Sequence, residues 1–441
     1  MQEVCLQKKE RITLAVIGNI GSGKSTMCGH LAIQLGQVND QKLKEVKQAC
    51  EDEGQDGINY SYIMDTKKVE RERKQSIDTS IFHFETDKFQ ITIIDTPGDT
   101  QYTKNMMTGI CLADAAILMI SAATDEFEKG FGKDGQTKDF ILHSYALGIK
   151  QMIVCINKMD DSKQSFCQKR FNEIKKEVKQ QFEKINFNLQ NIQFIPISAF
   201  LGDNLLEKSP NMPWYNSFTF LQALDNLMPL ARQNEGDLRL PVSYAFLVGE
   251  DTQVITGKVE QGILKANRTV CFAPFLGKGE NKFDIIQIEI QNKQVDEAVC
   301  GENVGFSIKN LNLNDLTKGS ICGYSGENQP RECETFDAEM VIINHPGSIK
   351  RGYRPMFCIH QAFVACEFID ILSKVERKTA QQISNKPDYI KNGEAAVVRV
   401  KPTKPLSVEK FSQCPSLGRF IVRDMNTIVA IGIIKDVVYK Q

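Results

Sequence analysis

A glycine-rich loop between an apolar strand and a helix is the feature that most constrains the fold of this chain. The strand RITLAVIG runs directly into the loop GNIGSGKS at residues 18–25, and a helical pattern follows to about residue 35. Glycines at this spacing let the backbone fold around phosphate oxygens, and the helix that follows offers them free N–H groups. Such a loop joins a strand of a parallel sheet to its crossover helix, so it predicts an α/β domain.

The side chains of this loop predict a triphosphate with a magnesium ion. Lys24 would neutralise the β- and γ-phosphates and support catalysis, and the Ser25 hydroxyl would ligate Mg²⁺. The N-terminus of the helix adds its dipole to the attraction for phosphate. The residues that we expect to hold the phosphates are Gly18, Asn19, Gly21, Ser22, Gly23, Lys24, Ser25 and Thr26.

Two later strand ends predict which base the nucleotide carries. NKMD at 157–160 follows the apolar strand QMIVCI, and ISAF at 197–200 ends the next strand. Asp160 would accept hydrogen bonds from guanine N1–H and the 2-amino group, which adenine lacks, and Asn157 would support the loops. A lysine stem would cover the base, and backbone N–H groups would meet the guanine oxygen; these contacts are assigned to Lys158, Ser198, Ala199 and Phe200. The pattern indicates GTP or GDP.

The segment IIDTPGDTQY at 93–102 predicts the opposite wall of the site. Asp95 would hold Mg²⁺ through water, and the Gly98 N–H would approach the γ-phosphate and support catalysis. Ser76, in QSIDTS, is a candidate second hydroxyl ligand to Mg²⁺; the alternative is an ordinary solvated loop residue. Asp99 stands where a group that orients the attacking water is expected. The predicted metal contacts are therefore Ser25, Ser76 and Asp95.

The remaining strand patterns predict three domains. Strands FQITIID, AAILMIS, QMIVCIN and IQFIPIS alternate with polar helices, as in a mostly parallel sheet with helices on both faces, and FHFETDKFQI indicates a hairpin at Asp87. From residue 238 onward, short alternating strands with Gly, Pro and Asn turns indicate β-barrels or sandwiches, and a turn-rich stretch near 326–334 separates two of them. The predicted fold is an α/β P-loop GTPase domain at 1–236 followed by β-barrel domains at 237–330 and 331–441.

Composition restricts the setting in which the chain acts. Its net charge is −1 with 25% charged residues, and it lacks the strongly basic footprint of a general nucleic-acid binder, so we expect no DNA partner. Thirteen cysteines without a CxxC pair indicate reduced thiols, and five histidines argue against a zinc site. The N-terminal residues lack the apolar core of a signal peptide, and no apolar run is long enough for a membrane span. We expect a cytoplasmic protein without a membrane partner.

Several further motifs carry a resemblance that covers nearly the whole chain. They are ERER at 70–73, KNMMTG at 104–109, EFEKG with GQTKD at 126–139, NMPW at 211–214, NVGFSIKN at 303–310, NHPG at 344–347 and LGRFIVRDM at 417–425. In these residues the chain resembles the eukaryotic elongation factor 1-alpha family of translational GTPases. The resemblance implies a GTP-binding domain with two β-barrels, GTP or GDP with Mg²⁺ as cofactors, and delivery of aminoacyl-tRNA to the ribosome. It also implies a guanine-nucleotide exchange factor as partner.

The chain departs from the family pattern mainly around the expected position of the attacking water. In the family's GHVDSGKS loop, Asn19 and Gly21 replace the histidine and the aspartate; in its GITI motif, Gln75 replaces the first isoleucine; and in DxPGH, Asp99 replaces the histidine. Negative charge spreads over the γ-phosphoryl oxygens in the transition state, so a nearby carboxylate raises the barrier. We expect GTP binding to persist and hydrolysis to be weakened. The alternative is that Asp99 turns into solvent and water is ordered in another way.

The residues implied to meet tRNA leave two functions open. By resemblance, Tyr102, Lys104 and Asn105 fall near the tRNA acceptor region and Glu260 near the terminal adenosine. The loop GEDTQ at 249–253, in contrast, has two carboxylates that would repel phosphate, and the chain has no lysine-rich tail. One reading is an elongation factor that delivers aminoacyl-tRNA. The other is a paralogue that serves as a nucleotide-bound scaffold in a cytoskeletal or other large assembly.

Overall fold

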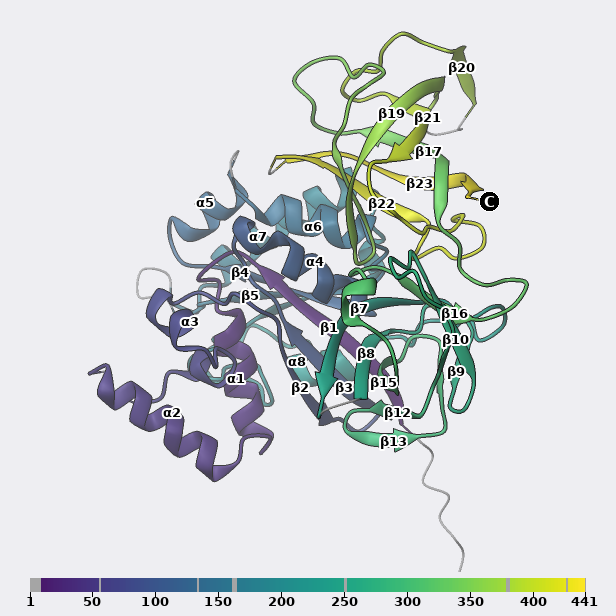
Figure 1. Cartoon of the computed structure of the whole chain (residues 1–441). Coiled ribbons are helices and arrows are strands. Elements are labelled where there is room, and N and C mark those ends of the chain that lie inside the picture. Colours follow the sequence, from purple (N-terminus) through teal and green to yellow (C-terminus); the bar gives the residue numbers. More distant parts are fainter. Residues whose placement is uncertain are drawn as a thin grey trace, which may run out of the picture. The chain divides into compact units, whose positions relative to one another are not determined.

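The computed structural model describes residues 9–54, 57–132, 135–160, 165–249, 252–377, 381–425 and 427–440 (Figure 1). These residues fall into two compact units. The first lies within residues 1–145 and 149–230, and the second within residues 146–148 and 231–441. Each unit has its own core, and the two are described separately below.

The first unit is built on a six-stranded sheet with the order β2-β3-β1-β4-β5-β6. Five strands run parallel, and β2 pairs antiparallel with β3 as the predicted hairpin, with Glu85 opposite Gln90. The carboxyl ends of β1, β3, β5 and β6 lead into the loops that the sequence assigned to the nucleotide. The strands are β1 (Glu10–Gly18), β2 (Ser80–Glu85), β3 (Phe89–Asp95), β4 (Ala115–Ser121), β5 (Met152–Asn157) and β6 (Ile192–Pro196).

The sheet is buried on both faces, which explains its nearly continuous apolar strands. Leu14 and Val16 of β1 pack into one cluster with α1, α2, η1 and α8, while the alternate residues Ala15 and Ile17 are just as buried and face the other side. The helices are α1 (Lys24–Gln34), α2 (Asp40–Asp52), α3 (Lys68–Arg73), α4 (Thr103–Leu112), α5 (Glu126–Phe131), α6 (Thr137–Ala146), α7 (Gln168–Lys184) and α8 (Phe220–Asp225), with 3₁₀ turns η1 (Tyr60–Ile63), η2 (Thr100–Tyr102) and η3 (Leu189–Asn191).

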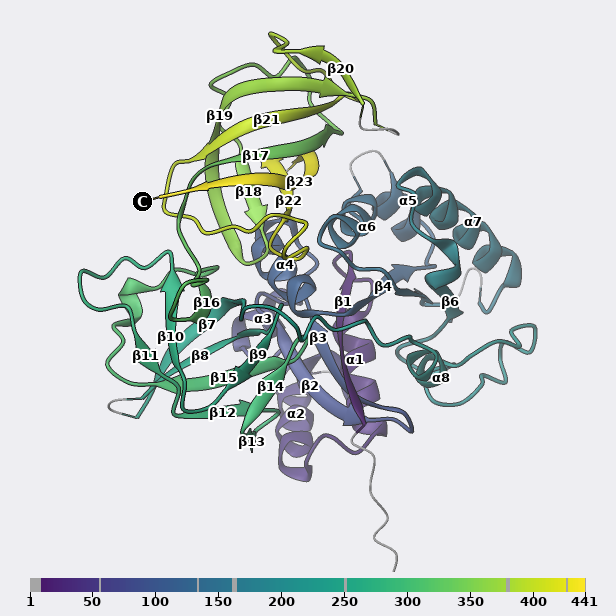
Figure 2. The ribbon, with the colours of Figure 1, turned by 90° about the vertical axis from the view of Figure 1, so that its right-hand side faces the viewer.

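The second unit begins with an eight-stranded antiparallel sheet with the order β11-β10-β16-β7-β8-β15-β12-β13, and β9 pairs with β14 beside it (Figure 2). Alternate residues of these short strands point into one apolar core, as in β15, where Val304, Phe306 and Ile308 are buried. The elements are β7 (Leu240–Val248), β8 (Thr252–Lys258), β9 (Ile263–Lys265), β10 (Thr269–Ala273), β11 (Phe283–Asp284), β12 (Gln287–Ile290), β13 (Lys293–Val295), β14 (Glu297–Val299), β15 (Asn303–Ile308), η4 (Leu313–Asp315) and β16 (Ile321–Tyr324).

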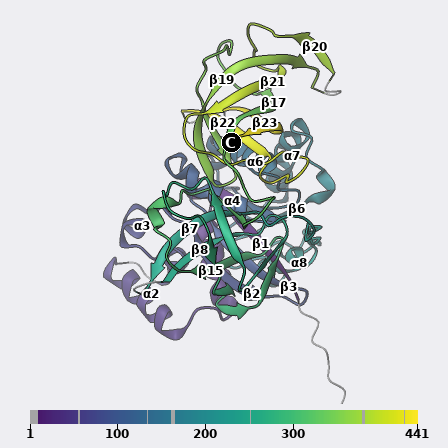
Figure 3. The ribbon, with the colours of Figure 1, turned by 45° about the vertical axis from the view of Figure 1, so that its right-hand side comes forward.

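The rest of the second unit is a closed barrel (Figure 3). Its strands follow the order β18-β22-β23-β17-β21-β19, pairing of β18 with β19 closes the ring, and β20 extends β19 outside it. Closure leaves no free sheet edge among these six strands. They are β17 (Cys333–Ile342), β18 (Met356–Ile359), β19 (Ala362–Val375), β20 (Gln382–Asn385), β21 (Ala395–Pro402), β22 (Arg419–Asp424) and β23 (Thr427–Tyr439).

The α/β domain with a mixed sheet followed by β-barrels confirms the predicted fold class. Among the described helices, none combines the length and the apolar character that a membrane span requires. The polar stretch that follows α1 contains α2. The carboxylates of Glu250 and Asp251, which the sequence suggested would repel phosphate, lie outside the described residues.

Candidate nucleotide site

The phosphate loop follows β1 and surrounds the buried side chain of Lys24. Gly23 adopts a left-handed conformation with φ of 91° at the start of α1, and a Cβ there would lie 2.1 Å from Asn157 Nδ2. Lys24 Nζ donates to the carbonyl oxygens of Gly18 at 2.9 Å and Asn19 at 3.0 Å. Burial lowers the pKa of Lys24, and the nearby carboxylate of Asp95 opposes that shift. The loop therefore holds an ammonium group where the backbone can surround an anion.

A cavity of about 420 Å³ opens in front of this loop. It lies between the loop, the segment from Asn59 to Ser76, and the two loops that the sequence assigned to the base. Of the predicted residues, the cavity brings together Gly21, Gly23, Lys24, Ser25, Thr26, Ser76, Gly98, Asn157, Lys158, Asp160, Ala199 and Phe200. Gly18, Asn19, Ser22, Asp95, Asp99 and Ser198 are not among its lining residues.

Asn157 joins the phosphate loop to the loop after β6. Its Nδ2 donates to the Ser22 carbonyl at 2.8 Å, and its Oδ1 accepts from the Ala199 N–H at 2.8 Å. The Ser198 N–H in turn donates to the Asp203 carbonyl at 3.3 Å. Two backbone donors expected to meet guanine are thus already used within the protein. The Phe200 N–H, for which the described residues hold no acceptor, is the remaining backbone donor at this corner.

Lys158 follows directly and extends along the side of the cavity. It adopts a left-handed conformation with φ of 61°, and its Nζ binds both oxygens of Glu126 at 2.8 and 2.7 Å. An ion pair at the tip fixes the direction of the four-carbon stem, which is the part expected to cover a base.

The two serines assigned to the metal meet at the opposite end of the cavity. Ser25 Oγ and Ser76 Oγ are 3.0 Å apart, and Ser76 Oγ also donates to Asp65 Oδ1 at 2.7 Å. Asp95 lies behind them with 1% of its surface exposed, and its Oδ1 has no hydrogen-bond partner in the described part of the chain. Burial raises the pKa of Asp95 to about 7, although Lys24 opposes the shift. This corner brings together two hydroxyl groups and a buried carboxylate oxygen that has no hydrogen-bond partner among the described residues.

Asp65 and Glu70 are site residues that the sequence did not reveal. Both are buried; burial raises the pKa of Asp65, and its bond from Ser76 opposes that shift. Glu70 Oε1 accepts from the backbone N–H groups of Ile77 at 2.8 Å and Asp78 at 3.1 Å, so it fixes the loop that carries Ser76. Glu70 belongs to ERER, a motif noticed only for the resemblance, and a lone aspartate such as Asp65 carries no local signal.

Both oxygens of the Asp99 carboxylate accept hydrogen bonds within the protein. Its Oδ1 accepts from the Gln101 N–H at 2.9 Å and from Thr100 Oγ1 at 3.3 Å, and its Oδ2 accepts from Gln75 Nε2 at 3.1 Å. The side chain is therefore partly exposed, bonded within the protein, and not among the residues that line the cavity. The neighbouring Gly98 does approach the phosphate loop, because a Cβ there would lie 2.5 Å from Lys24 Nζ.

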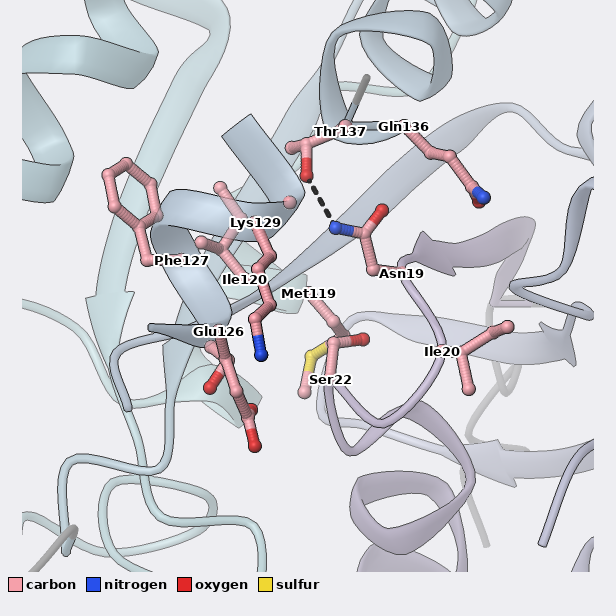
Figure 4. A pocket seen from close by; sticks show the side chains of 13 residues that line it. Asn19, Ile20, Ser22, Met119, Ile120, Glu126, Phe127, Lys129, Gln136 and Thr137 are labelled. Atoms are coloured by element: carbon pink, nitrogen blue, oxygen red, sulfur yellow. Dashed lines mark hydrogen bonds between the residues drawn. The ribbon is translucent and has the colours of Figure 1, made fainter. Parts of the chain in front are cut away.

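Asn19 contributes its backbone to the phosphate loop while its side chain points elsewhere. Its Nδ2 donates to Thr137 Oγ1 at 3.0 Å (Figure 4). A Cβ at Gly130 would lie 2.1 Å from the same nitrogen, so Gly130 leaves the space that the amide occupies. Asn19 and Ser22 line a second, smaller cavity of about 250 Å³ together with residues of β4, α5 and the start of α6.

Two of the residues implied to meet tRNA have partners within the protein. Asn105 Nδ2 donates to the Ile77 carbonyl at 2.9 Å and to Asp78 Oδ1 at 3.2 Å. In the second unit, Glu260 accepts from His360 Nε2 at 3.0 Å. Burial raises the pKa of Glu260, but the hydrogen bond and the charges of His360 and Lys258 outweigh burial and lower that pKa to about 2.

Comparison with known proteins agrees with this geometry along the whole chain. The family model for the elongation factor Tu GTP binding domain matches residues 9–230, the model for elongation factor Tu domain 2 matches 252–323, and the model for the eEF1A C-terminal domain matches 335–435. The three matches follow one another in the order of the phosphate-loop domain and the two barrels.

Curated relatives match over almost their full length. Elongation factor 1-alpha of Entamoeba histolytica is 43% identical over 433 residues, which is 98% of this chain and 96% of the relative. That of Coccidioides immitis is 40% identical over 443 residues, covering 98% and 95%. Among solved structures, the GTP-bound Ski7 GTPase-like domain of S. cerevisiae shares the fold, with a TM-score of 0.78 at 18% identity over 97% of both chains. The chain belongs to the elongation factor 1-alpha family of translational GTPases.

Proposed function

We propose that the protein binds GTP with Mg²⁺, carries aminoacyl-tRNA to the ribosome in the cytoplasm, and hydrolyses its GTP slowly. The observation that carries the proposal is 43% identity to an elongation factor 1-alpha over 98% of the chain, combined with a cavity lined by the residues expected to hold the phosphates and guanine. A relationship over both barrels as well as the nucleotide domain favours the complete function rather than nucleotide binding alone.

The metal corner supports Mg²⁺ as the cofactor. Octahedral Mg²⁺ holds its oxygen ligands at about 2.1 Å, which places neighbouring ligands about 3.0 Å apart. Ser25 Oγ and Ser76 Oγ have this separation, at 3.0 Å. The buried Asp95, with an oxygen that lacks a partner among the described residues, supplies the charge that a cation would balance. When bound, the ion would neutralise charge on the β- and γ-phosphates.

Slow hydrolysis is proposed from the two residues that replace the family's side chains around the attacking water. The family's isoleucine and histidine are here Gln75 and Asp99, and neither reproduces the original chemistry: an amide does not form an apolar gate, and the Asp99 carboxylate is bonded to Gln75, Thr100 and Gln101 and does not line the cavity. A residue that positions water contributes about 10²- to 10⁴-fold if it acts like a general acid–base group. The rate should fall by a factor within that range.

Protection of aminoacyl-tRNA from spontaneous deacylation tests the carrier function. The full chain would be loaded with a non-hydrolysable GTP analogue or with GDP, and a Lys24→Ala variant would serve as the control for nucleotide dependence. Protection that requires the GTP analogue is the expected result. Equal deacylation with either nucleotide, by protein shown to be loaded, would contradict the carrier function and favour the scaffold reading.

A further inference from the structure

Gln75 and Asp99, the two residues that depart most from the family around the attacking water, are bonded to each other. Gln75 Nε2 donates to Asp99 Oδ2 at 3.1 Å, joining two loops that are 24 positions apart in the chain. A carboxylate offers only acceptors, so the Gln75 amide must turn its NH₂ group toward Asp99. The carbonyl Oε1 then forms the other end of the amide, and it takes part in no hydrogen bond within the described residues.

The surroundings of Asp99 keep its carboxylate away from the nucleotide cavity. Its Oδ1 is held by the Gln101 N–H at 2.9 Å and the Thr100 hydroxyl at 3.3 Å, so that Gln75 occupies the other oxygen. Asp99 is absent from the residues that line the cavity, whereas Gln75 is one of them. Of the two bonded residues, only Gln75 therefore borders the cavity.

Gln75 also stands where the γ-phosphate end of a nucleotide is expected. It directly precedes Ser76, whose Oγ lies 3.0 Å from Ser25 Oγ in the metal corner. Its backbone N–H donates to the Glu70 carbonyl at 3.0 Å, which fixes the start of the side chain. Both ends of Gln75, the backbone at Glu70 and the NH₂ at Asp99, are thus anchored on the protein.

We propose that Gln75 holds the attacking water in this protein and that Asp99 is the positioning residue that orients its amide. The proposal rests on the proposed function, because it concerns the GTP that the cavity is inferred to bind. The Gln75 carbonyl would accept a hydrogen bond from the water. An amide carbonyl is neutral and adds no full charge beside the γ-phosphoryl oxygens, so the pair removes the repulsion that a lone aspartate would cause.

Hydrolysis assisted by this pair transfers no proton to the Gln75 amide. The water oxygen forms a bond to the γ-phosphorus, the bond from that phosphorus to the β–γ bridging oxygen breaks, and GDP leaves with that oxygen. The water's protons end on inorganic phosphate and solvent. Glutamine orients water in other GTP-hydrolysing enzymes by the same chemistry.

Single-turnover hydrolysis of γ-labelled GTP by the full chain on ribosomes tests the proposal. Gln75→Ala should slow hydrolysis by about 10²-fold while the affinity for GTP stays unchanged. Gln101→Ala is the matched control, because it keeps the backbone N–H that binds Asp99 and removes only an exposed side chain. A rate for Gln75→Ala equal to that of the control would overturn the proposal.

The direction in which Asp99→Asn changes the rate of GTP hydrolysis distinguishes a positioning role of Asp99 from simple charge repulsion. The Gln101 N–H keeps the remaining oxygen as its acceptor, so the new NH₂ group faces Gln75 and forces the Gln75 amide to reverse. The carbonyl then turns away from the water, and the rate should fall. If Asp99 acts only through its charge, removing that charge should raise the rate, which would overturn the positioning role.

The double variant Gln75→Ala with Asp99→Asn supplies a second readout. A residue that acts through Gln75 has nothing to position once Gln75 is gone, so the double variant should hydrolyse GTP at the rate of Gln75→Ala. Independent, multiplying losses would overturn the proposal. Binding of a fluorescent GTP analogue distinguishes the two levels of failure: a parent that binds no GTP overturns the proposed function together with this inference, whereas a parent that binds and hydrolyses GTP at a rate that Gln75→Ala leaves unchanged overturns the inference alone.

Discussion

In the half of the cavity that faces the base and the phosphates, Lys24, Asn157 and Asp160 keep the residue types that the family motifs require. In the half that faces the attacking water, an isoleucine and a histidine of the family pattern have become Gln75 and Asp99, and the two new residues are bonded to each other. Bound nucleotide stabilises a protein whether or not it is turned over. The residue types of the two halves therefore change separately, and we infer that holding GTP and hydrolysing it can vary independently in this fold.

Restoring the family residues at positions 75 and 99 should have the largest effect on the difference between the two halves. The double substitution Gln75→Ile with Asp99→His should raise ribosome-stimulated hydrolysis by about 10²-fold, because an imidazole can orient water without a carboxylate nearby. The affinity for GTP should stay the same, since neither residue belongs to the phosphate loop. Single-turnover kinetics and nucleotide titration measure the two quantities. Unchanged kinetics would mean that another feature limits the rate.

A substitution in the half that faces the base and the phosphates should change the affinity for GTP. Lys24→Ala removes the buried ammonium group expected on the β- and γ-phosphates, and each hydrogen bond to a charged group contributes about 1.5–3 kcal/mol. GTP binding should weaken by about 10- to 100-fold in a fluorescent-nucleotide titration. Lys44→Ala, on the exposed side of α2, is the matched control. Equal affinities of the two variants would remove Lys24 from the site.

Asn157→Ala should show how much the two hydrogen bonds of Asn157 contribute to the stability of the first unit. The substitution leaves the Ser22 carbonyl and the Ala199 N–H without their partner, and an unsatisfied buried group costs about 1–3 kcal/mol. The free energy of unfolding of the first unit should fall by that amount or more. Denaturant unfolding monitored by Trp214, the single tryptophan of the chain, reports on this unit. Gln190→Ala, an exposed position in η3, should leave the transition unchanged.

The smallest effect is expected at the metal corner. Ser76→Ala removes one hydroxyl beside Ser25 and should weaken GTP binding by about tenfold in the presence of Mg²⁺, equivalent to about 1.4 kcal/mol. With EDTA in place of Mg²⁺, the parent and the variant should bind GTP equally. A difference that persists in EDTA would assign Ser76 a role other than the metal.

Sequence patterns predicted the framework of the site because glycine spacing and apolar strands act locally. The strand, loop and helix around Gly18 to Ser25, the hairpin at Asp87 and the change to barrels after residue 238 follow from short segments. The hydrogen bond between Gln75 and Asp99 does not, because it depends on how two loops 24 positions apart meet in space. Asp65 is similar: only folding buries it beside Ser76.

The motifs also did not predict where side chains point. The phosphate-loop pattern includes Asn19, yet its amide turns to Thr137 because Gly130 leaves room there. The motif after β6 assigned the Ala199 N–H to guanine, yet Asn157 already accepts from it. A pattern gives residue types at positions, whereas hydrogen-bond partners depend on neighbours from other strands.

The most direct test of the separation between the two halves is a paired measurement on the unmodified protein. GTP affinity and the single-turnover rate of GTP hydrolysis on ribosomes would be determined beside those of an ordinary elongation factor 1-alpha under the same conditions. We expect similar affinities and a hydrolysis rate about 10²-fold lower for this protein. A rate equal to that of the ordinary factor would contradict the separation of the two halves, because the changes at Gln75 and Asp99 would then have no effect on turnover.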